Sequence, residues 1–329
     1  MNGRERFQQT MAYSQPDRVP YFEEGIREEV LEAWRAQGMP SKVTIRDLFP
    51  FDFREEIMPD MEPRPFLKKW PSDRSELATL KRCLDPKDPG RLPARWPKMI
   101  RVKRDRGDIV MLRVHRGFFQ SMGISGWKRF AEVMYMLFDD PGLVHEIMEI
   151  QGEFAAGLVD KVLKEVEIDA AIFSEPIAGN DGPLISPEMY DEFVLPHYEP
   201  ILEVLRRYGV ETIIIRTYAN TRVLLPSIMK WNFNCLWACE TNPEAMDYQD
   251  IRREIGRDLR LIGGIDVDVL RQDKESIRRD VEERVPLLLE DGGFIPLADG
   301  RIRAEISFEN YVAYRRILDE VVENHRLRH

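Results

Sequence analysis

Apolar runs in the second half of the chain end on polar side chains that could bind a small molecule and move a proton. If each run is a β-strand, alternation places Arg216 and Tyr218 on one face. Carboxylates and phenols can exchange protons in catalysis, and a guanidinium can hold an anion in two hydrogen bonds. The candidates are therefore, for catalysis, Glu175, Tyr218 and Asp299, and, for substrate binding, Arg216 and Asp266.

Several polar residues beside these run ends could also contact a substrate. Arg116 and Arg301 could join Arg216 in holding a carboxylate or phenolate group. The alternative is that such residues only cap strands and helices or pair with one another, and Asp266 could be the N-cap of a helix that begins at VDVL. The further substrate-binding candidates are His115, Arg116, Asn220 and Arg301.

A metal site is conceivable where the run Phe233–Cys239 ends. Cys239 and Glu240 offer a thiolate and a carboxylate, but adjacent residues of an extended strand face opposite ways. Both can coordinate one ion only if the strand has already ended. The alternative for Cys235 and Cys239 is burial as small apolar residues. Cys239 and Glu240 are thus metal candidates, without a histidine pair beside them.

The elements that must position these residues alternate along the chain from Asp169 onward. Short apolar runs are separated by longer amphipathic ones, which is typical of parallel strands joined by helices. Asp140-Pro141 and Ser186-Pro187 read as helix starts, with a capping side chain followed by proline. The expected strands are Ala170–Ser174, Thr212–Arg216, Phe233–Cys239, Leu259–Ile265 and Phe294–Leu297.

The first 130 residues are less regular and rich in proline. We expect one early strand over Arg18–Glu23, followed by a long elaboration. The segments Lys98–Arg104 and Asp108–Gly117 flank Asp105-Arg106-Gly107, a turn-like tripeptide, so they are predicted to pair as a β-hairpin.

Composition excludes some function classes. The chain has 58 acidic and 48 basic residues, a net charge of -10, so a nucleic-acid partner or an anionic membrane has no electrostatic support. No apolar run approaches the roughly 20 residues of a membrane helix. The N-terminus MNGRERFQQT lacks the apolar segment of a secretion signal, and three cysteines do not make a disulfide framework. We expect a soluble, cytoplasmic protein.

Several blocks together resemble the uroporphyrinogen decarboxylase superfamily. They are RERFQQTMAYSQPDRVP, GPLISPEMYDEFVLPHYEPILEVLRRYGVE, RLIGGIDVDVL and GGFIPLADGRIRAEISFENY. The resemblance implies one domain over residues 1–329, a (β/α)8 barrel with an N-terminal elaboration and the hairpin, and a homodimer. In such barrels the carboxyl ends of the strands carry the chemistry, so the polar run ends should converge on one mouth.

The overall resemblance is to the branch of methylcobamide-dependent methyltransferases, but the chain departs from the family at three places, of which only the first points away from the true decarboxylases and the other two put the carry-over of family chemistry in doubt. The Arg-rich motif of the decarboxylases is replaced by YFEEGIREEV. The His-x-Cys zinc pair of the methyltransferases falls on Arg216 and Tyr218, and an arginine cannot ligate zinc. A histidine that follows the last strand's aspartate in relatives is replaced by Gly300 and Arg301.

Three functions follow from these expectations. The first is methyl transfer between a small, anionic, methylated or methoxylated substrate and a corrinoid carried by a partner protein. The second is decarboxylation, or a related lyase reaction, of a carboxylated small molecule, which needs no metal. The third is a non-catalytic barrel, because a fold does not imply a function.

Overall fold

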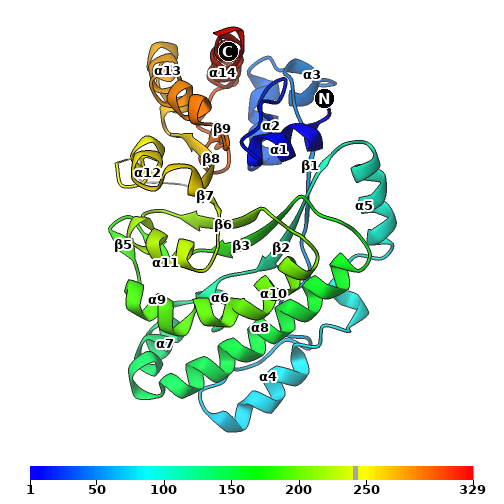
Figure 1. Cartoon of the computed structure of the whole chain (residues 1–329), viewed down its shortest axis with the longest axis vertical. Helices are drawn as coiled ribbons and strands as arrows, with labels where there is room; N and C mark the ends of the chain where they lie inside the picture. The colour runs from blue at the N-terminus through cyan, green and yellow to red at the C-terminus, as the bar shows by residue number, and fades with distance from the viewer. Residues whose placement is uncertain (240–243, 329) are drawn as a thin grey trace.

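Seven parallel strands form one curved sheet at the centre of the computed structural model, which describes residues 1–239 and 244–328 (Figure 1). Along the sheet the strands follow their order in the chain, and each neighbouring pair is parallel. β4 (Ala178–Gly179) and β5 (Gly182–Pro183) form a separate antiparallel pair. The sheet strands are β1 (Arg54–Ile57), β2 (Ile109–His115), β3 (Ala170–Glu175), β6 (Ile213–Tyr218), β7 (Cys235–Cys239), β8 (Arg260–Ile265) and β9 (Phe294–Ala298).

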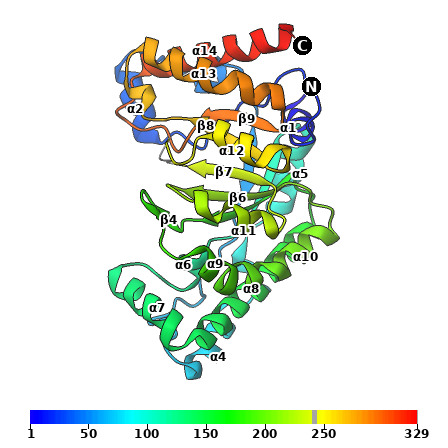
Figure 2. The same cartoon turned by 60° about the vertical axis from the view of Figure 1, so that its left-hand side comes forward.

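Helices connect successive strands and cover the outer face of the sheet (Figure 2). The expected helix starts are confirmed: the Asp140 carboxylate accepts from the amide of Leu143 at 3.2 Å, and Ser186 Oγ accepts from that of Met189 at 3.2 Å. The helices after β2 are α6 (Phe118–Ser121), α7 (Trp127–Asp139), α8 (Pro141–Leu163), α9 (Pro187–Phe193), α10 (Glu199–Arg207), α11 (Leu225–Lys230), α12 (Tyr248–Ile255), α13 (Lys274–Asp291) and α14 (Phe308–Arg328).

The two faces of the sheet pack into two separate cores. The outer core lies between the sheet and the helices and contains Ala171 and Phe173 of β3. The inner core lies within the curve of the sheet and contains Ala170 and Ile172 of the same strand, with Trp237 of β7. Because both faces are apolar, each strand is buried on both sides, as in other parallel sheets.

The segment Arg18–Glu23, which was expected to be a strand, is not a regular strand. The structure therefore shows a curved parallel sheet of seven strands among the described residues and not the predicted closed barrel of eight. The segment is extended and lies between the two edge strands. The backbone carbonyl of Tyr21 accepts from the Asp52 amide at 2.6 Å, and that of Gly25 accepts from the Ile302 amide at 3.2 Å. The Asp52 carboxylate, not the backbone of β1, accepts from the Tyr21 amide. Single hydrogen bonds, and not a regular ladder, therefore join this segment to the chain beside β1.

The predicted β-hairpin is wrong. Trp96–Asp105 forms helix α5, with Pro97 in its first turn and Ile100 buried. Asp108–Gly117 does contain strand β2, but its partners are β1 and β3, both parallel to it. The remaining N-terminal helices are α1 (Gly3–Met11), α2 (Glu28–Ala36), α3 (Ile45–Leu48) and α4 (Leu77–Cys83). Within the described ranges, every helix is too short or too polar to cross a membrane.

Candidate functional site

An ion cluster lies on the inner face of the sheet near the carboxyl ends of β1, β2 and β6. Arg216 donates to Glu56 through Nη1 and Nη2 at 3.1 and 3.0 Å. Arg113 donates to the same carboxylate from Nε at 2.9 Å, and Arg54 from Nη1 at 3.0 Å. We call Arg54, Arg113 and Arg216 around Glu56 the arginine cluster. β1 and β6 are not neighbours in the sheet, so the curve of the sheet brings them together.

Charge is unbalanced in the arginine cluster, because three guanidinium groups share one carboxylate. The Glu56 side chain is only 11% exposed and that of Arg216 only 4%. Burial by itself would raise the pKa of Glu56, but Arg216, Arg113 and Arg54 outweigh it and hold that pKa at about 2. Glu56 is therefore ionised, and the three guanidinium groups exceed this one carboxylate by two charges, an excess that Glu24 reduces through its attraction to Arg54. That excess suits an anionic ligand.

An aromatic ring forms the floor beneath the arginine cluster. The guanidinium carbons of Arg54 and Arg216 lie 5.0 and 5.3 Å from the centre of the Trp237 ring. Such cation–π contacts fix the planes of the two guanidinium groups. The Nε of Arg216 is buried and has no hydrogen-bond partner among the described residues. One donor of the cluster is thus left for another group.

Tyr218 and Cys239 stand beside the cluster as register neighbours at the ends of β6 and β7. Burial, followed by Cys239, raises the pKa of Tyr218, while Arg216 opposes the rise. Burial also raises the pKa of Cys239 well above its usual range, and its thiol hydrogen-bonds Glu24. Tyr218 is thus a protonated phenol next to a guanidinium, and Cys239 is a protonated thiol.

Asp299 lies at the carboxyl end of β9, as expected, but it is tied to the backbone. Its Oδ1 accepts from the Gly264 amide at 2.9 Å. Gly263 has φ +117° and makes room for this carboxylate, since a Cβ there would lie 2.2 Å from Oδ1. Asp299 also contributes to the raised pKa of Cys239, so the two side chains are near one another. The structure therefore brings Tyr218, Arg216 and Asp299 to one end of the sheet.

Glu175 does not face this mouth. Alternation along β3 puts it on the outer face with Ala171 and Phe173. Its carboxylate accepts from the Phe118 amide at 2.9 Å and from the hydroxyl of Tyr198. Burial raises the pKa of Glu175 to about 7. This placement contradicts the expectation that Glu175 is catalytic at the mouth. The sequence could not show the difference, because β3 is apolar on both faces and nothing in it marks which face is the inner one.

His115 lies in the same outer position as Glu175. Its ring centre is 4.4 Å from that of Tyr198, and its Nδ1 accepts from the Gly117 amide at 3.0 Å. The register of β2 against β3 shifts between Arg113 and His115, so Arg113 points inward while His115 turns outward. Burial, with Arg116 second, lowers the pKa of His115 to about 3. The neutral ring is packed in the outer core and is not at the mouth.

Two other candidates hold turns at strand ends. Asp266 Oδ1 accepts from the Asp268 amide at 2.9 Å and so holds a turn, but the N-cap of the short helix that follows is Asp268, so Asp266 is not the N-cap that the alternative interpretation expected. Asn220 Oδ1 accepts from the Arg222 amide at 3.2 Å. Both side chains shape loops beside the mouth.

The remaining arginines lie in loops beyond the strands. Arg116 pairs with Glu62, and its guanidinium carbon lies 5.7 Å from the centre of the Trp70 ring. Its Nε and Nη2 are buried without a partner among the described residues. Arg301 is exposed after β9. Neither forms a described contact with the arginine cluster.

The zinc site of the methyltransferases does not fit the residues present. Its His-x-Cys positions are held by Arg216 and Tyr218, and Arg216 is already engaged with Glu56. Residues 1–239 and 244–328 contain no group of three or more side chains that could hold a metal ion. Cys239 faces Glu24, and Glu240 lies outside the described residues.

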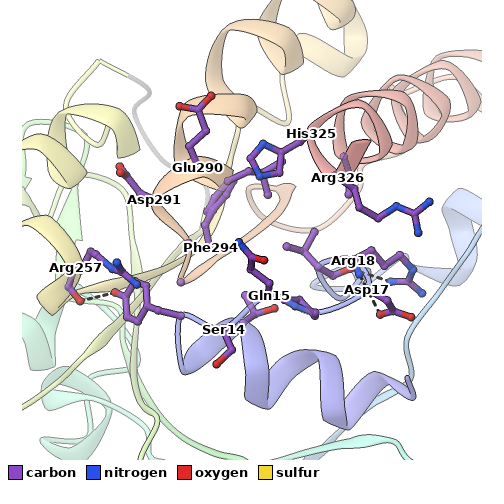
Figure 3. Close-up of a pocket in the computed structure, with 18 residues that line it drawn as sticks. Ser14, Gln15, Asp17, Arg18, Arg257, Glu290, Asp291, Phe294, His325 and Arg326 are labelled. Carbon is purple, nitrogen blue, oxygen red and sulfur yellow. Dashed lines mark hydrogen bonds between the residues drawn. The ribbon is translucent and has the colours of Figure 1, made fainter. Parts of the chain in front are cut away.

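A pocket of about 310 Å³ opens at the other end of the sheet (Figure 3). It is lined by the loop 13–19 after α1, by Arg257, and by the turn 290–293 that leads into β9. Phe294, the first residue of β9, lies in its wall. This pocket is therefore at the amino ends of the strands, away from the arginine cluster.

Comparison with known proteins decides the family. A family model described as Uroporphyrinogen decarboxylase (URO-D) matches residues 60–295. The chain belongs to the URO-D family. The uroporphyrinogen decarboxylase of Picosynechococcus sp. is 23% identical over 160 residues, which are 48% of this chain and 43% of that protein. That of Hydrogenovibrio crunogenus is 26% identical over 158 residues, 47% of this chain and 42% of that protein.

The URO-D resemblance drawn from sequence blocks is thus confirmed, while the alignments span less than half the length of the curated relatives. Sequence reasoning missed Arg54, Glu56 and Arg113. A signal existed for Arg113, a lone charge within the apolar run IVMLRVH, and for the alternate charged positions Arg54 and Glu56 in REEI. The first segment lies in the predicted hairpin and the second in the predicted N-terminal elaboration, where charged side chains are expected on the surface.

Proposed function

We propose that this URO-D-family chain is an enzyme that acts on a small anionic molecule bound at the arginine cluster. One observation carries the proposal: the guanidinium groups of three arginines converge on the single carboxylate of Glu56, so positive charge remains in excess at this end of the sheet. An anion that enters this mouth meets arginines already fixed by Glu56 and Trp237, so little side-chain conformational entropy is lost on binding. Arginine also suits carboxylates because its planar fork makes two parallel hydrogen bonds.

Decarboxylation of a carboxylated small molecule is the reaction that these residues support best. The bond between the carboxyl carbon and its neighbour breaks, CO2 leaves, and the electron pair stays on the substrate. The arginine cluster would stabilise that negative charge. The protonated Tyr218 hydroxyl would then supply the proton that completes the product. Glu23 and Glu24 stand where the Arg-rich motif of uroporphyrinogen decarboxylases falls, which favours a different and smaller substrate.

Methyl transfer is the second candidate, and the neighbourhood of Tyr218 and Arg216 is the observation that favours it. When a methyl group leaves a methoxylated aromatic molecule, the oxygen keeps the bonding electrons as a phenolate. Tyr218 could protonate that oxygen while Arg216 stabilises its charge. The methyl group would pass to a reduced corrinoid on a partner protein, as the resemblance to that branch implies.

The test separates binding from the two reactions. Calorimetric titration with a panel of small carboxylates and phenolates should find ligands whose affinity falls roughly tenfold or more in Arg216→Lys. Arg101→Lys, on exposed α5, is the matched control and should leave affinity unchanged. Ligands are then assayed for CO2 release and, with reduced corrinoid, for methyl transfer by absorbance. Failure of every anion to bind overturns the proposal, and binding without either reaction would favour the non-catalytic alternative.

A further inference from the structure

Three arginines surround one tyrosine beside the pocket at the amino ends of the strands. Tyr13 lies just after helix α1 and lines the pocket. The guanidinium carbons of Arg257, Arg260 and Arg252 lie 4.5, 5.4 and 5.9 Å from the centre of its ring. Cation–π contacts of this kind hold a guanidinium in place beside the ring. We call Arg252, Arg257 and Arg260 the Tyr13 arginines.

Backbone carbonyls, and not carboxylates, accept from the Tyr13 arginines in the part of the chain that the structure describes. Arg252 donates from Nη1 to the Gly256 carbonyl and from Nη2 to the Gly292 carbonyl, each at 3.0 Å, and Arg260 donates to the Met11 carbonyl. These carbonyls lie where helices α12, α13 and α1 end. A helix end carries only about half an elementary charge, so each guanidinium exceeds the partial charge that it meets.

The acidic side chains of the pocket do not cancel this excess. Glu290 and Asp291 line it but are exposed, and the Glu290 carboxylate points away from the other labelled side chains (Figure 3). Asp17 is already paired with Arg6, at 2.7 Å. Arg252, by contrast, is only 5% exposed. Because water and salt screen exposed charges more than buried ones, positive charge prevails beside the pocket.

The residues that present Arg257 to the pocket are held in place. Tyr13 has a φ of +56°, which residues other than glycine seldom adopt. Its ring packs on Gly293, where a Cβ would lie 2.3 Å from Tyr13 Cε1. The Tyr13 hydroxyl donates to the Arg257 carbonyl at 2.5 Å. The Arg257 side chain, exposed and stacked on the same ring, is therefore oriented before any ligand arrives.

The pocket also offers an unused hydroxyl and an apolar wall. Thr10 lines the pocket, and its buried hydroxyl has no hydrogen-bond partner among the described residues. Rotation about the Cα–Cβ bond can turn this hydroxyl toward a bound group. Val19, Leu289 and Val322 add apolar surface. The volume of about 310 Å³ suits a small organic molecule with one polar end.

We infer that this pocket binds a small organic phosphate, with its phosphate group against Arg257 and its organic part against the apolar wall. A phosphate monoester carries roughly 1.5 to 2 negative charges at neutral pH, so it offsets the excess of the Tyr13 arginines better than a carboxylate does. A guanidinium can also donate to two phosphate oxygens at once. The site lies at the amino ends of the strands, so it is separate from the arginine cluster and from either reaction proposed there.

Calorimetric titration of the full-length chain with phenyl phosphate tests the site. Arg257→Gln removes the guanidinium and should weaken binding about tenfold. Arg253→Gln removes another exposed arginine, on the neighbouring helix α12, and should leave binding unchanged. The binding that Arg257→Gln loses should persist in Arg216→Lys, which alters only the arginine cluster. Phenyl sulfate has nearly the same shape but a single charge, so it should bind several-fold more weakly than phenyl phosphate.

Hydrogen exchange then locates the bound phosphate. Phenyl phosphate should slow amide exchange in residues 13–19 and 290–293 of the wild type but not of Arg257→Gln, whose circular dichroism spectrum should match the wild type because the side chain is exposed. Thr10→Val keeps the shape, removes the hydroxyl and should weaken binding a few-fold. The inference is overturned if phenyl phosphate does not bind at millimolar concentration. Full binding in Arg257→Gln, with loss only in Arg216→Lys, overturns it too and leaves the arginine cluster as the anion site.

Discussion

Glu56 and Arg216 lie 160 positions apart in the chain and meet in a two-point ion pair, with both N–O distances close to 3 Å. The pair joins β1 to β6 across the inside of the curved sheet, although β2 and β3 lie between those strands. Arg54 and Arg113 converge on the same carboxylate. Glu56 is thus both the counter-ion of the mouth and the group that limits how many charges remain for a ligand.

Replacing Glu56 by glutamine should destabilise the fold and strengthen the binding of anions at the arginine cluster. Three guanidinium groups would lose their buried counter-ion, which should lower the free energy of unfolding by about 3 kcal/mol. Added phosphate should stabilise Glu56→Gln more than it stabilises the wild type. Denaturant titration with and without phosphate measures both effects. Glu55→Gln, which breaks a partly exposed pair with Lys103, should cost less than about 1 kcal/mol.

The same carboxylate predicts sensitivity to acid. The pKa of Glu56 is about 2 in the fold and near 4.5 when the chain is unfolded. A lowered pKa means that the stabilisation is complete above about pH 4.5 and is lost as the pH falls toward 2. Wild type should therefore lose more stability than Glu56→Gln between about pH 5 and pH 3. Equal losses in the two proteins would show that Glu56 does not titrate in this way.

Glu175 predicts the opposite dependence. Burial raises its pKa to about 7 from an ordinary 4.5, so the neutral acid is favoured in the fold. Its contribution is complete below about pH 4.5 and is lost as the pH rises through 7. Glu175→Gln, which stays neutral, should gain stability relative to wild type between about pH 5 and pH 8. Denaturant titration across that range measures the difference, and a constant difference would contradict the prediction.

Gly263 should tolerate no side chain. In Gly263→Ala the new Cβ would lie 2.2 Å from Asp299 Oδ1 at a backbone φ of +117°. We expect a loss of about 2 kcal/mol or more in the free energy of unfolding, since strain and displacement of Asp299 act together. Gly179→Ala, where no described atom lies within 4 Å of the new Cβ, is the control and should change stability little.

Once a substrate is found, kinetic measurements on variants should separate the residues that bind it from the residue that transfers a proton. Tyr218→Phe removes the proton donor and should lower kcat on the order of 100-fold with a small change in KM. Arg216→Lys should raise KM as well, because the two-point contact is lost. Glu175→Gln, on the outer face, should leave both constants within a few-fold of wild type. A large fall in kcat in Glu175→Gln would show that Glu175 takes part in catalysis.

The sequence by itself determined the elements of the second half of the chain. Apolar runs spaced by amphipathic segments predicted β3 and β6 to β9, because parallel strands and helices differ in length and period. The caps at Asp140 and Ser186 were predictable since they depend on neighbours three residues away. Arg216, Tyr218 and Asp299 could be assigned to strand ends for the same local reason.

Only the tertiary structure decided which side chains meet. A parallel strand buried on both faces has no polar side to mark its outer face, so Glu175 and Arg216 looked equivalent in sequence although one faces the helices and the other the mouth. The register shift after Arg113 turned His115 outward, and that shift depends on pairing with β3. Glu56 and Arg54 joined Arg216 because the sheet curves, and curvature arises from strand pairing that no local segment encodes.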